Sequence, residues 1–365
     1  MSKLKFNNGR FRILQLSDIQ EIADTNPDTI NLTRELIERT NPDLIVLTGD
    51  QIKGYGITMQ KGDSKTNAAL TLNNILAPIK AIGVPFTAVF GNHDVFGEAD
   101  EDFQWSVYSL CDSFVGKDYK FDCIPVYDAD DNIKFAVYTF DSGLKIKGKY
   151  SPVKDELIDR YIAKREELKA EAVNYVNALA FQHIPPADIY DCLVEAPKGT
   201  YRALQGAGKF SDKYYRLPSY AVSARSFMGE NAASPDEKGR QVEALKEKGD
   251  VLGLFFGHDH NNSFVVKHGS LDLGYTQGAG FNIYGPGLCR GGRVLDIYED
   301  APHKYETFTV MAADMPDFRL ERPVKEFIYT HSPSSVSEGI KLAKKVLAGA
   351  GVAVAAATAI KLIKK

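Results

Sequence analysis

Short apolar runs alternate with helix-period stretches along most of this 365-residue chain, and this alternation limits the fold more than any other feature. Six runs rich in β-branched and aromatic residues have the length and composition of buried strands. They span residues 11–16, 44–48, 85–90, 134–140, 177–182 and 251–256. Stretches 27–39, 66–82 and 155–176 lie between some of them and repeat apolar residues at helix spacing. Strand, helix, strand order predicts parallel strands covered by helices, an α/β fold.

The pattern changes after Gly257. Four short strand-like runs follow one another with turn residues between them and no room for helices, at 263–267, 270–275, 292–298 and 305–310. Consecutive strands joined in this way usually pair antiparallel. We therefore predict a second, antiparallel sheet in this part of the chain.

Polar side chains that can bind metal ions follow five of the six predicted strands. In chain order they are Asp18 with Gln20, Asp50, Asn92 with His93 and Asp94, His183, and His258 with His260. In α/β sheets ligands gather at the carboxyl ends of strands, because the loops diverge there. We therefore expect these side chains to share one site.

The spacing within the motifs supports this interpretation. Residues i and i+2 of an extended segment point to the same side, so Asp18 with Gln20 can present two groups to one cavity. The same holds for His258 with His260. Asp50 follows a glycine, which allows a close approach of the backbone, and its two oxygens can bridge two cations.

Asn92 and His93 are neighbours and point in different directions, so we expect Asn92 to bind metal and His93 to face the substrate. Two divalent ions roughly 3.5–4 Å apart would activate a water and hold the phosphoryl oxygens for in-line attack. Such chemistry requires no covalent enzyme intermediate.

Charge and cysteine content narrow the function further. A net charge of -4 argues against binding of nucleic acid, which needs a basic surface. A phosphorylated small molecule or a phosphoprotein is the expected substrate. The four cysteines form no C-x-x-C pair, and residues 1–8 contain no apolar run typical of a secretory signal. We therefore expect a cytoplasmic protein, with peripheral membrane binding as the alternative discussed below.

Residues 185–250 are polar, long and irregular in pattern, which is typical of an insertion that faces the substrate. Glu230 in this insertion and Tyr284 near the last strands are candidates for contacting the substrate at the rim of the cleft, together with Asn92 and His93. Residues 311–337 are rich in proline and charge and predict a linker or strap.

Residues 338–365 are rich in Ala, Gly and Lys and predict a C-terminal helix. Its uncharged part, residues 346–360, would be about 22 Å long as a helix, short of the roughly 30 Å hydrocarbon core of a bilayer. The flanking lysines and the small residues allow association with a membrane surface or with another subunit. Docking of this helix on its own domain is the simpler alternative.

In this order the motifs resemble those of the calcineurin-like metallophosphoesterase superfamily, D-x-H, G-D, G-N-H-D/E, a single H and G-H-x-H. Residues 257–262, the glycine-rich 278–281 and the run 181–185, which ends in H-I-P, are similar to the purple-acid-phosphatase-like branch. The resemblance implies a domain over residues 1–310 with two packed mixed β-sheets flanked by helices. It also implies a phosphoesterase that acts on a monoester or diester with two divalent ions, Mn, Fe, Zn or Mg.

The resemblance also assigns a role to each matching residue. One metal would be bound by Asp18, Asp50 and His260, with Gln20 as a further ligand, and the other by Asp50, Asn92, His183 and His258. His93 would contact the phosphate and protonate the leaving oxygen, and Asp94 would orient the His93 imidazole.

Gln20 departs from the family pattern, which has a histidine at this place. Its amide oxygen could bind a hard cation, which would shift the metal preference. Alternatively it stands off the metal and binds a water. In a third interpretation the first metal site is weak, and the protein is a slow enzyme or a binding or regulatory protein. We favour the first two, because glutamine also stands at this place in some branches that look active.

Overall fold

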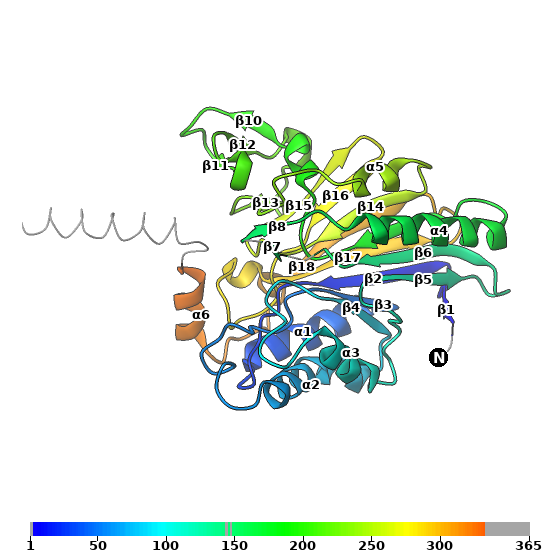
Figure 1. Ribbon diagram of the computed structural model, residues 1–365. Helices are drawn as coiled ribbons and strands as arrows, with labels where there is room; N and C mark the ends of the chain where they lie inside the picture. The colour runs from blue at the N-terminus through cyan, green and yellow to red at the C-terminus, as the bar shows by residue number, and fades with distance from the viewer. Residues whose placement is uncertain (1–2, 143–144, 147, 333–365) are drawn as a thin grey trace, which may run out of the picture.

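Two mixed β-sheets pack face to face, and helices cover their outer faces (Figure 1). The computed structural model describes residues 3–142, 145, 146 and 148–332. The predicted helix over 338–365 lies outside the described residues, as does the end of the predicted linker.

The first sheet contains eight strands, in the order β1 (Leu4–Lys5), β5 (Phe121–Tyr127), β6 (Ile133–Phe140), β9 (Ala178–Phe181), β14 (Val251–Phe256), β16 (Leu271–Tyr275), β15 (Asn262–His268) and β13 (Phe227–Met228). The second contains five, in the order β18 (Tyr305–Met311), β17 (Gly291–Tyr298), β2 (Arg10–Leu16), β3 (Leu44–Thr48) and β4 (Phe86–Val89). In the eight-stranded sheet the parallel strands β6, β9, β14 and β16 lie at the centre. In the five-stranded sheet the parallel strands β2, β3 and β4 form one side, and the antiparallel strands β17 and β18 form the other.

The α/β fold class and the two packed mixed sheets predicted from the motifs are therefore confirmed. The prediction of a separate antiparallel sheet after Gly257 is wrong. Strands β15 and β16 extend the eight-stranded sheet, where β16 pairs parallel with β14, whereas β17 and β18 join the five-stranded sheet beside β2. A run of consecutive strands does not reveal which of two sheets each strand joins.

Alternating residues of the strands build the layers. Phe11 and Ile13 of β2 face the core between the sheets, where they pack with Phe181 and Phe255 of the other sheet. Leu14 and Leu16 face the opposite way, toward the helices that cover the five-stranded sheet. This alternation is the two-residue period of a strand that is buried on both faces.

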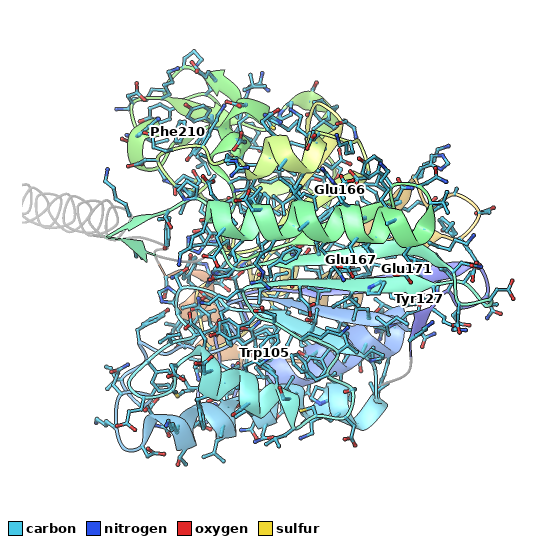
Figure 2. All side chains as sticks on the ribbon, turned by 45° about the vertical axis from the view of Figure 1, so that its right-hand side comes forward. Trp105, Tyr127, Glu166, Glu167, Glu171 and Phe210 are labelled. Carbon is cyan, nitrogen blue, oxygen red and sulfur yellow. The ribbon has the colours of Figure 1, made fainter. Side chains whose placement is uncertain are left out.

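Six α-helices occur among the described residues: α1 (Pro27–Thr40), α2 (Ser64–Ile82), α3 (Glu101–Ser109), α4 (Asp155–Ala172), α5 (Gln241–Lys246) and α6 (Pro323–Thr330). Helices α1, α2 and α3, with Trp105, cover the five-stranded sheet, and α4 and α5 cover the eight-stranded one (Figures 1 and 2). The outer surface of α4 carries Glu166, Glu167 and Glu171 (Figure 2).

Local capping fixes several helix ends. Helix α1 begins after Asn26, whose side chain accepts a hydrogen bond from the Asp28 amide, and α2 begins after Asp63, which caps the Thr66 amide. Helix α4 ends at Ala172, four residues before the predicted end, because Val173 adopts a left-handed backbone with φ of 70°.

Residues 185–250 form a substructure above the eight-stranded sheet (Figure 1). Besides β13 and α5 it contains the three-stranded sheet of β10 (Val194–Ala196), β12 (Tyr214–Arg216) and β11 (Leu204–Gln205), with the 3-10 helices η1 (Ala187–Cys192), η2 (Gly208–Phe210) and η3 (Ser219–Ala221). The ring of Phe210 stacks on Tyr190 at 4.0 Å.

The remaining elements are short. Strands β7 (Lys145–Ile146) and β8 (Lys149–Tyr150) form a hairpin, and η4 (Gly287–Cys289) and η5 (Ala312–Asp314) flank the last strands. No helix among the residues that the structure describes is long and apolar enough to cross a membrane.

Candidate metal centre

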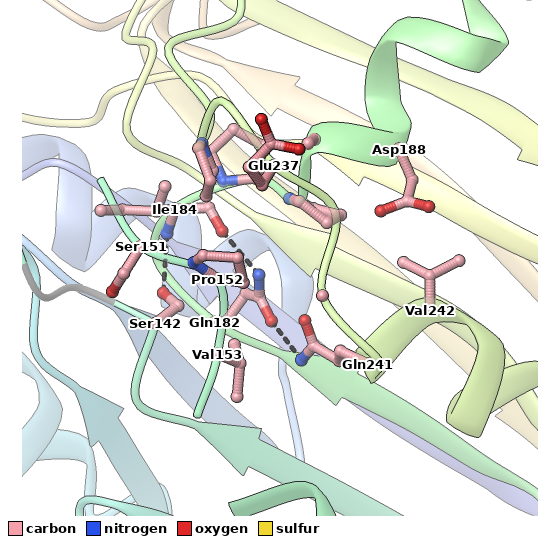
Figure 3. A pocket seen from close by; sticks show the side chains of 15 residues that line it. Ser142, Ser151, Pro152, Val153, Gln182, Ile184, Asp188, Glu237, Gln241 and Val242 are labelled. Carbon is pink, nitrogen blue, oxygen red and sulfur yellow. Dashed lines mark hydrogen bonds between the residues drawn. The ribbon is translucent and has the colours of Figure 1, made fainter. Parts of the chain in front are cut away.

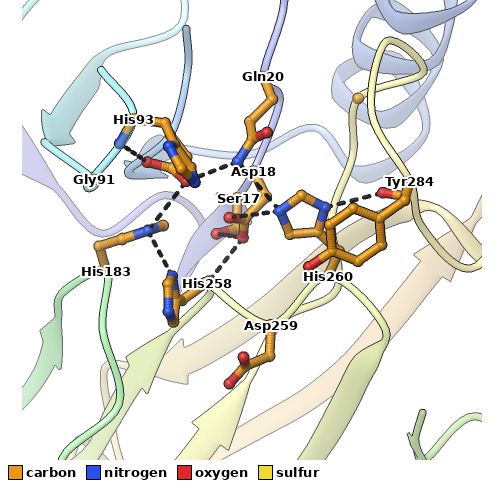
Figure 4. Close-up of polar contacts among 12 residues, drawn as sticks. Ser17, Asp18, Gln20, Gly91, His93, His183, His258, Asp259, His260 and Tyr284 are labelled. Atoms are coloured by element: carbon orange, nitrogen blue, oxygen red, sulfur yellow. Dashed lines mark hydrogen bonds and ion pairs between the residues drawn. The ribbon is translucent and has the colours of Figure 1, made fainter. Parts of the chain in front are cut away.

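The five motifs meet between the carboxyl ends of the strands that they follow (Figure 4). Asp18 and Gln20 come after β2, Asp50 after β3, His183 after β9, and His258 and His260 after β14. Backbone hydrogen bonds fasten the loops together. The Asp18 amide donates to the Gly49 carbonyl at 3.1 Å, and the Gly257 amide donates to the His183 carbonyl at 3.1 Å.

One group of candidate ligands consists of Asp50, His183 and His258, whose ligand atoms all lie within 4.8 Å of one another. The Nε2 atom of His183 lies 3.4 Å from Asp50 Oδ2 and 3.3 Å from His258 Nδ1. Asn92 joins this group, since its Oδ1 lies 3.2 Å from His183 Nε2. We name these four residues cluster A.

A second group consists of Asp18, Asp50 and His260, which meet the same distance criterion. His260 Nε2 lies 3.4 Å from Asp18 Oδ1, and the Gln20 amide nitrogen lies 2.7 Å from Asp50 Oδ2 and 3.3 Å from His260 Nε2. We name these four residues cluster B. Asp50 belongs to both clusters, so all seven side chains predicted as metal ligands lie together.

Backbone carbonyls orient two of the histidines. His183 Nδ1 donates to the Thr48 carbonyl at 2.9 Å, and His260 Nδ1 donates to the Tyr284 carbonyl at 2.9 Å. In both rings Nε2 is therefore the atom that faces the cluster. A carbonyl on the outer nitrogen is the usual arrangement of a metal-binding histidine, because it fixes both the tautomer and the ring orientation.

The buried carboxylates control the charge of these rings. Burial lowers the pKa of His183, but the negative charges of Asp50 and Asp18 outweigh it and raise the pKa to about 10. The pKa of His260 is raised too, because Asp18 outweighs burial in the same way. Burial and the charge of His183 lower the pKa of His258 to about 3, so this ring is neutral.

The backbone of the centre is strained. Four non-glycine residues of the clusters adopt the left-handed region, namely Asp18, Gln20, Asp50 and His258, with φ values of 51°, 40°, 53° and 74°. Each such residue costs on the order of 1–3 kcal/mol and persists only where the surroundings enforce it. Concentration of this strain at the clusters is typical of a functional site.

Two glycines are required by close approach. A Cβ on Gly49, whose φ is 87°, would lie 2.5 Å from the His183 ring. A Cβ on Gly280 would lie 1.6 Å from the Ile19 carbonyl oxygen, between Asp18 and Gln20. Neither position can carry a side chain without movement of the His183 ring or of the backbone between Asp18 and Gln20.

A polar network holds the loop of His183 (Figure 3). The Ser142 hydroxyl accepts hydrogen bonds from the amides of His183 and Ile184 at 3.1 and 2.9 Å. Gln182 donates to the Ile184 carbonyl at 2.6 Å and accepts from Gln241 of α5 at 2.6 Å. The loop is therefore tied to the helix layer of the eight-stranded sheet.

His93 lies beside the clusters, and its amide donates to Asp50 Oδ1 at 2.8 Å (Figure 4). The contacts of Asp94 do not fit its predicted role of orienting the His93 imidazole. Its Oδ2 accepts hydrogen bonds from the amides of Gly91 and Asp50 at 2.7 and 2.9 Å, and its Oδ1 from the Ile52 amide at 2.8 Å. Three amides of the tight loops thus occupy the carboxylate, which positions Asp50 and not the His93 imidazole.

Glu230 and Tyr284 were predicted at the rim of the cleft, but they lie behind His260. The Tyr284 ring stacks on the His260 imidazole at 4.3 Å, and its hydroxyl donates to Glu230 Oε2 at 3.1 Å. Glu230 Oε1 accepts from the Asn261 amide at 2.7 Å. These contacts fix the plane of the His260 ring. A buried glutamate in an irregular insertion gives no sequence signal for this role.

Two tyrosines also lie at the centre, and the sequence pattern did not predict either of them. The Tyr55 hydroxyl donates to Gln20 Oε1 at 3.1 Å, and its half-exposed ring lies 4.5 Å from the ring of His93. Tyr150 of β8 meets the His258 ring edge-on at 4.9 Å. Tyr55 lies five residues after Asp50, but nothing in the pattern distinguishes it from an ordinary loop tyrosine.

The donor groups fit two divalent cations that share Asp50. Asp18 Oδ1 is buried and faces only the His260 ring, with Nε2 3.4 Å away, whereas its other oxygen accepts from Ser17 and from the His258 amide. Buried carboxylates without full pairing are costly unless a cation is bound. Carboxylate, amide and imidazole ligands suit Mg, Mn, Fe or Zn, so the donor set does not select one metal.

Comparison with known proteins agrees with this arrangement. Residues 11–262 match the family model described as calcineurin-like phosphoesterase, and the chain belongs to this family. The resemblance predicted from the motifs is thus confirmed. The match to the family model does not test the glutamine at position 20.

Similar curated proteins include "Probable inactive purple acid phosphatase 14" of Arabidopsis thaliana, 24% identical over 341 residues, which cover 80% of this chain and 77% of that protein. "Phosphatase DCR2" of Saccharomyces cerevisiae is 30% identical over 103 residues, 24% of this chain and 17% of that protein. Among solved structures, a dimetal phosphatase from Danio rerio aligns with 83% of this chain and 99% of its own, at 13% identity and a TM-score of 0.48.

Proposed function

We infer that this protein is a dinuclear metal-dependent phosphoesterase that hydrolyses a phosphomonoester or a phosphodiester of a small molecule or protein. The observation that carries this proposal is the pair of buried clusters that share Asp50. Two divalent ions, when bound, supply Lewis acid chemistry, which polarises the phosphoryl group and lowers the pKa of water. The family membership supports the same reaction class.

The protein residues hold the reacting groups in place. The Asp94 carboxylate accepts a hydrogen bond from the Asp50 amide and so positions Asp50, which belongs to both clusters. The carbonyls of Thr48 and Tyr284 keep His183 and His260 turned inward. Preset ligands of this kind require little rearrangement during the reaction, and this favours catalysis.

His93 is the candidate for proton transfer to the leaving oxygen. Burial lowers the pKa of its imidazole, so the ring is neutral at neutral pH and can donate one N–H to a phosphoryl oxygen. A phosphate beside the ring would raise its pKa again through its negative charge. A general acid requires such a rise in pKa, because it must hold the proton that it later donates.

The test combines metal content with turnover of p-nitrophenyl phosphate and its bis ester in Mn²⁺, Mg²⁺, Zn²⁺, Fe²⁺ or Co²⁺. We expect two metals per chain and hydrolysis of at least one ester. His93→Ala should lower kcat by about 10²–10⁴-fold with metal content unchanged. Asp50→Asn should reduce both. His303→Gln, at an exposed histidine in the turn between β17 and β18 that belongs to no group of candidate ligands, is the matched control. Two bound metals without turnover of either ester under any of these ions would overturn the proposal.

A binding or regulatory protein on the same fold is the second candidate. The Gln20 amide nitrogen donates to Asp50 Oδ2, which places its amide oxygen toward Tyr55 and away from cluster B. Metal binding by Gln20 requires the amide to turn over. If it does not turn, cluster B has one ligand fewer, and one metal per chain without turnover is the expected result.

A further inference from the structure

Three side chains that can bind a metal ion lie together away from clusters A and B. They are Asp188 and Asp191 of η1 and His268, the last residue of β15, and their ligand atoms all lie within 4.8 Å of one another. We name them the η1 cluster. Strand β15 begins two residues after His260 of cluster B, and its ends lie roughly 20 Å apart at about 3.4 Å per residue. The η1 cluster is therefore separate from the metal centre.

The local backbone brings the two carboxylates together. A 3-10 helix has three residues per turn, so the side chains of residues i and i+3 lie above one another. Asp188 and Asp191 have this spacing. At the end of β15, His268 Nε2 lies 3.4 Å from Asp191 Oδ2. Two neighbouring carboxylates repel each other unless positive charge lies close to both.

The buried side of the η1 cluster lacks hydrogen-bond partners. Asp188 is only 4% exposed, and its Oδ2 atom has no hydrogen-bond partner in the described part of the chain. The buried Nδ1 atom of His268 also lacks a partner there. Asp188 lines a small cavity together with the apolar side chain of Val242 of α5 (Figure 3).

These surroundings leave the Asp188 carboxylate short of positive charge. Burial raises the pKa of Asp188, and the nearby charge of Lys238 offsets this rise only in part. A buried carboxylate without a hydrogen-bond donor or a cation is costly. A bound cation would remove this cost.

Lys238 supplies some positive charge, but it does not complete the cluster. Its ammonium group donates to Asp191 Oδ2, whereas Asp188 Oδ2 receives no hydrogen bond from it. The side chains of Lys238 and Asp191 are 50% and 43% exposed, and ion pairs with this exposure contribute little to stability. Lys238 can therefore turn into solvent, and it competes with a metal ion for Asp191.

We propose that the η1 cluster is a third metal site, which binds Zn²⁺ through Asp188, Asp191 and His268 after Lys238 has moved away. Two carboxylates and one imidazole suit a borderline ion, whereas Mg²⁺ and Ca²⁺ prefer oxygen ligands alone. The bound zinc fastens η1 of the 185–250 insertion to β15 of the eight-stranded sheet.

Competition with Lys238 makes this site weaker than clusters A and B. The third zinc binds only while free Zn²⁺ is present, so the two metals that remain after free metal is removed belong to clusters A and B. The proposal does not depend on phosphoesterase activity.

The experiment is equilibrium dialysis of the whole 365-residue protein at rising free Zn²⁺, with zinc counted per chain. Amide hydrogen exchange of residues 187–192 is followed in the same samples. Asp188→Asn and His268→Gln each remove one ligand, and Lys238→Met removes the competing charge but keeps the alkyl chain. His303→Gln, at an exposed histidine in the turn between β17 and β18, is the matched control. Thermal unfolding checks that every variant folds.

The unchanged protein and His303→Gln should bind one zinc more than Asp188→Asn and His268→Gln, and this zinc should slow hydrogen exchange in residues 187–192. Lys238→Met should bind it about two- to fivefold more tightly, because an exposed ion pair no longer has to break. The difference of one zinc remains even if clusters A and B prove to bind no metal.

Two results would overturn the proposal. In the first, Asp188→Asn and His268→Gln bind as much zinc as the unchanged protein, so that the η1 cluster holds none of it. In the second, Lys238→Met gains no zinc affinity at residues 187–192, which would show that the three side chains and Lys238 form an ion-pair network and not a metal site.

Discussion

Metal binding to this centre should displace protons, and the effect is large enough to measure. In the metal-free protein the fields of Asp50 and Asp18 raise the pKa of His183 to about 10, and Asp18 also raises that of His260. A metal ion needs the same Nε2 atoms in their unprotonated form. His258, with a pKa of about 3, is already neutral at neutral pH and releases no proton.

The magnitude follows from one displaced proton in each cluster. Well below the raised pKa, the apparent affinity of each cluster should rise tenfold per pH unit. Between pH 6 and 8 this amounts to about a hundredfold for cluster A, or ~2.7 kcal/mol, because the pKa of His183 is about 10. The affinity of cluster B should rise in the same direction, since the pKa of His260 is raised as well. The stability of the metal-free protein changes with pH in the opposite direction and falls as the pH rises. The raised pKa of His183 gives stability that is complete below its ordinary pKa of 6.5 and is lost as the pH rises through about 10.

Isothermal titration of Mn²⁺ into the metal-free protein, in buffers of equal pH and different ionisation enthalpy, counts the released protons. We expect about one proton from His183 when cluster A fills at pH 7, and a further release from His260 when cluster B fills. His303→Gln should leave the proton release unchanged, because His303 is exposed and belongs to no group of candidate ligands. An affinity that does not change between pH 6 and 8, with no proton transferred to the buffer, would show that His183 and His260 are neutral and would refute the electrostatic argument.

Three further predictions concern single residues. Gln20→His should move the metal preference toward Zn²⁺ in a competition with Mn²⁺ followed by metal analysis, and an unchanged ratio would mean that residue 20 does not reach the metal. Val173→Gly should raise the free energy of unfolding in urea by about 0.5–1 kcal/mol. The substitution relieves a left-handed backbone strain of about 1–2 kcal/mol at a residue that is 81% exposed. Glycine makes the unfolded chain more flexible, which costs about 0.5–1 kcal/mol of stability. A lower free energy of unfolding in the variant would contradict this prediction. Gly280→Ala should cost about 2 kcal/mol or more and release the metal of cluster B, because the new methyl group overlaps the Ile19 carbonyl, and normal metal content would speak against this.

The sequence predicted the elements that carry the clusters because their strands are fully buried. In β3 every residue is buried, so the apolar run 44–48 coincides with the strand. Strand β5 (Phe121–Tyr127) was missed, since Asp122 and Pro125 interrupt its pattern. These residues are tolerated because the Asp122 carboxylate accepts from backbone amides and because β5 has only the two-residue β1 on its other side.

The candidate ligands could also be found from sequence, since each motif directly follows a buried strand. The expected i, i+2 geometry of an extended segment is wrong for them, because Asp18, Gln20 and His258 adopt a left-handed backbone. The contacts that support these ligands could not be predicted from the sequence. Asp94 is adjacent to His93 in sequence, yet it binds backbone amides, because a tight loop exposes several donors at once. The contacts of Tyr55 with Gln20 and of Glu230 with Tyr284 join segments whose relative position only the folded chain determines.

The way in which the clusters are divided along the chain has a consequence for how the protein is made. Cluster A needs His258, and cluster B needs His260. Residues 278 and 279 join the loops of His260 and Asp18, because the Gly278 amide donates to the His260 carbonyl and the Ala279 amide donates to the Ser17 carbonyl. A nascent chain that has not yet reached residue 258 therefore lacks a member of each cluster. The complete ligand set exists only after residue 260 has been synthesised, so the strands that carry Asp18 and Asp50 are made before either cluster can bind its metal with all of its ligands.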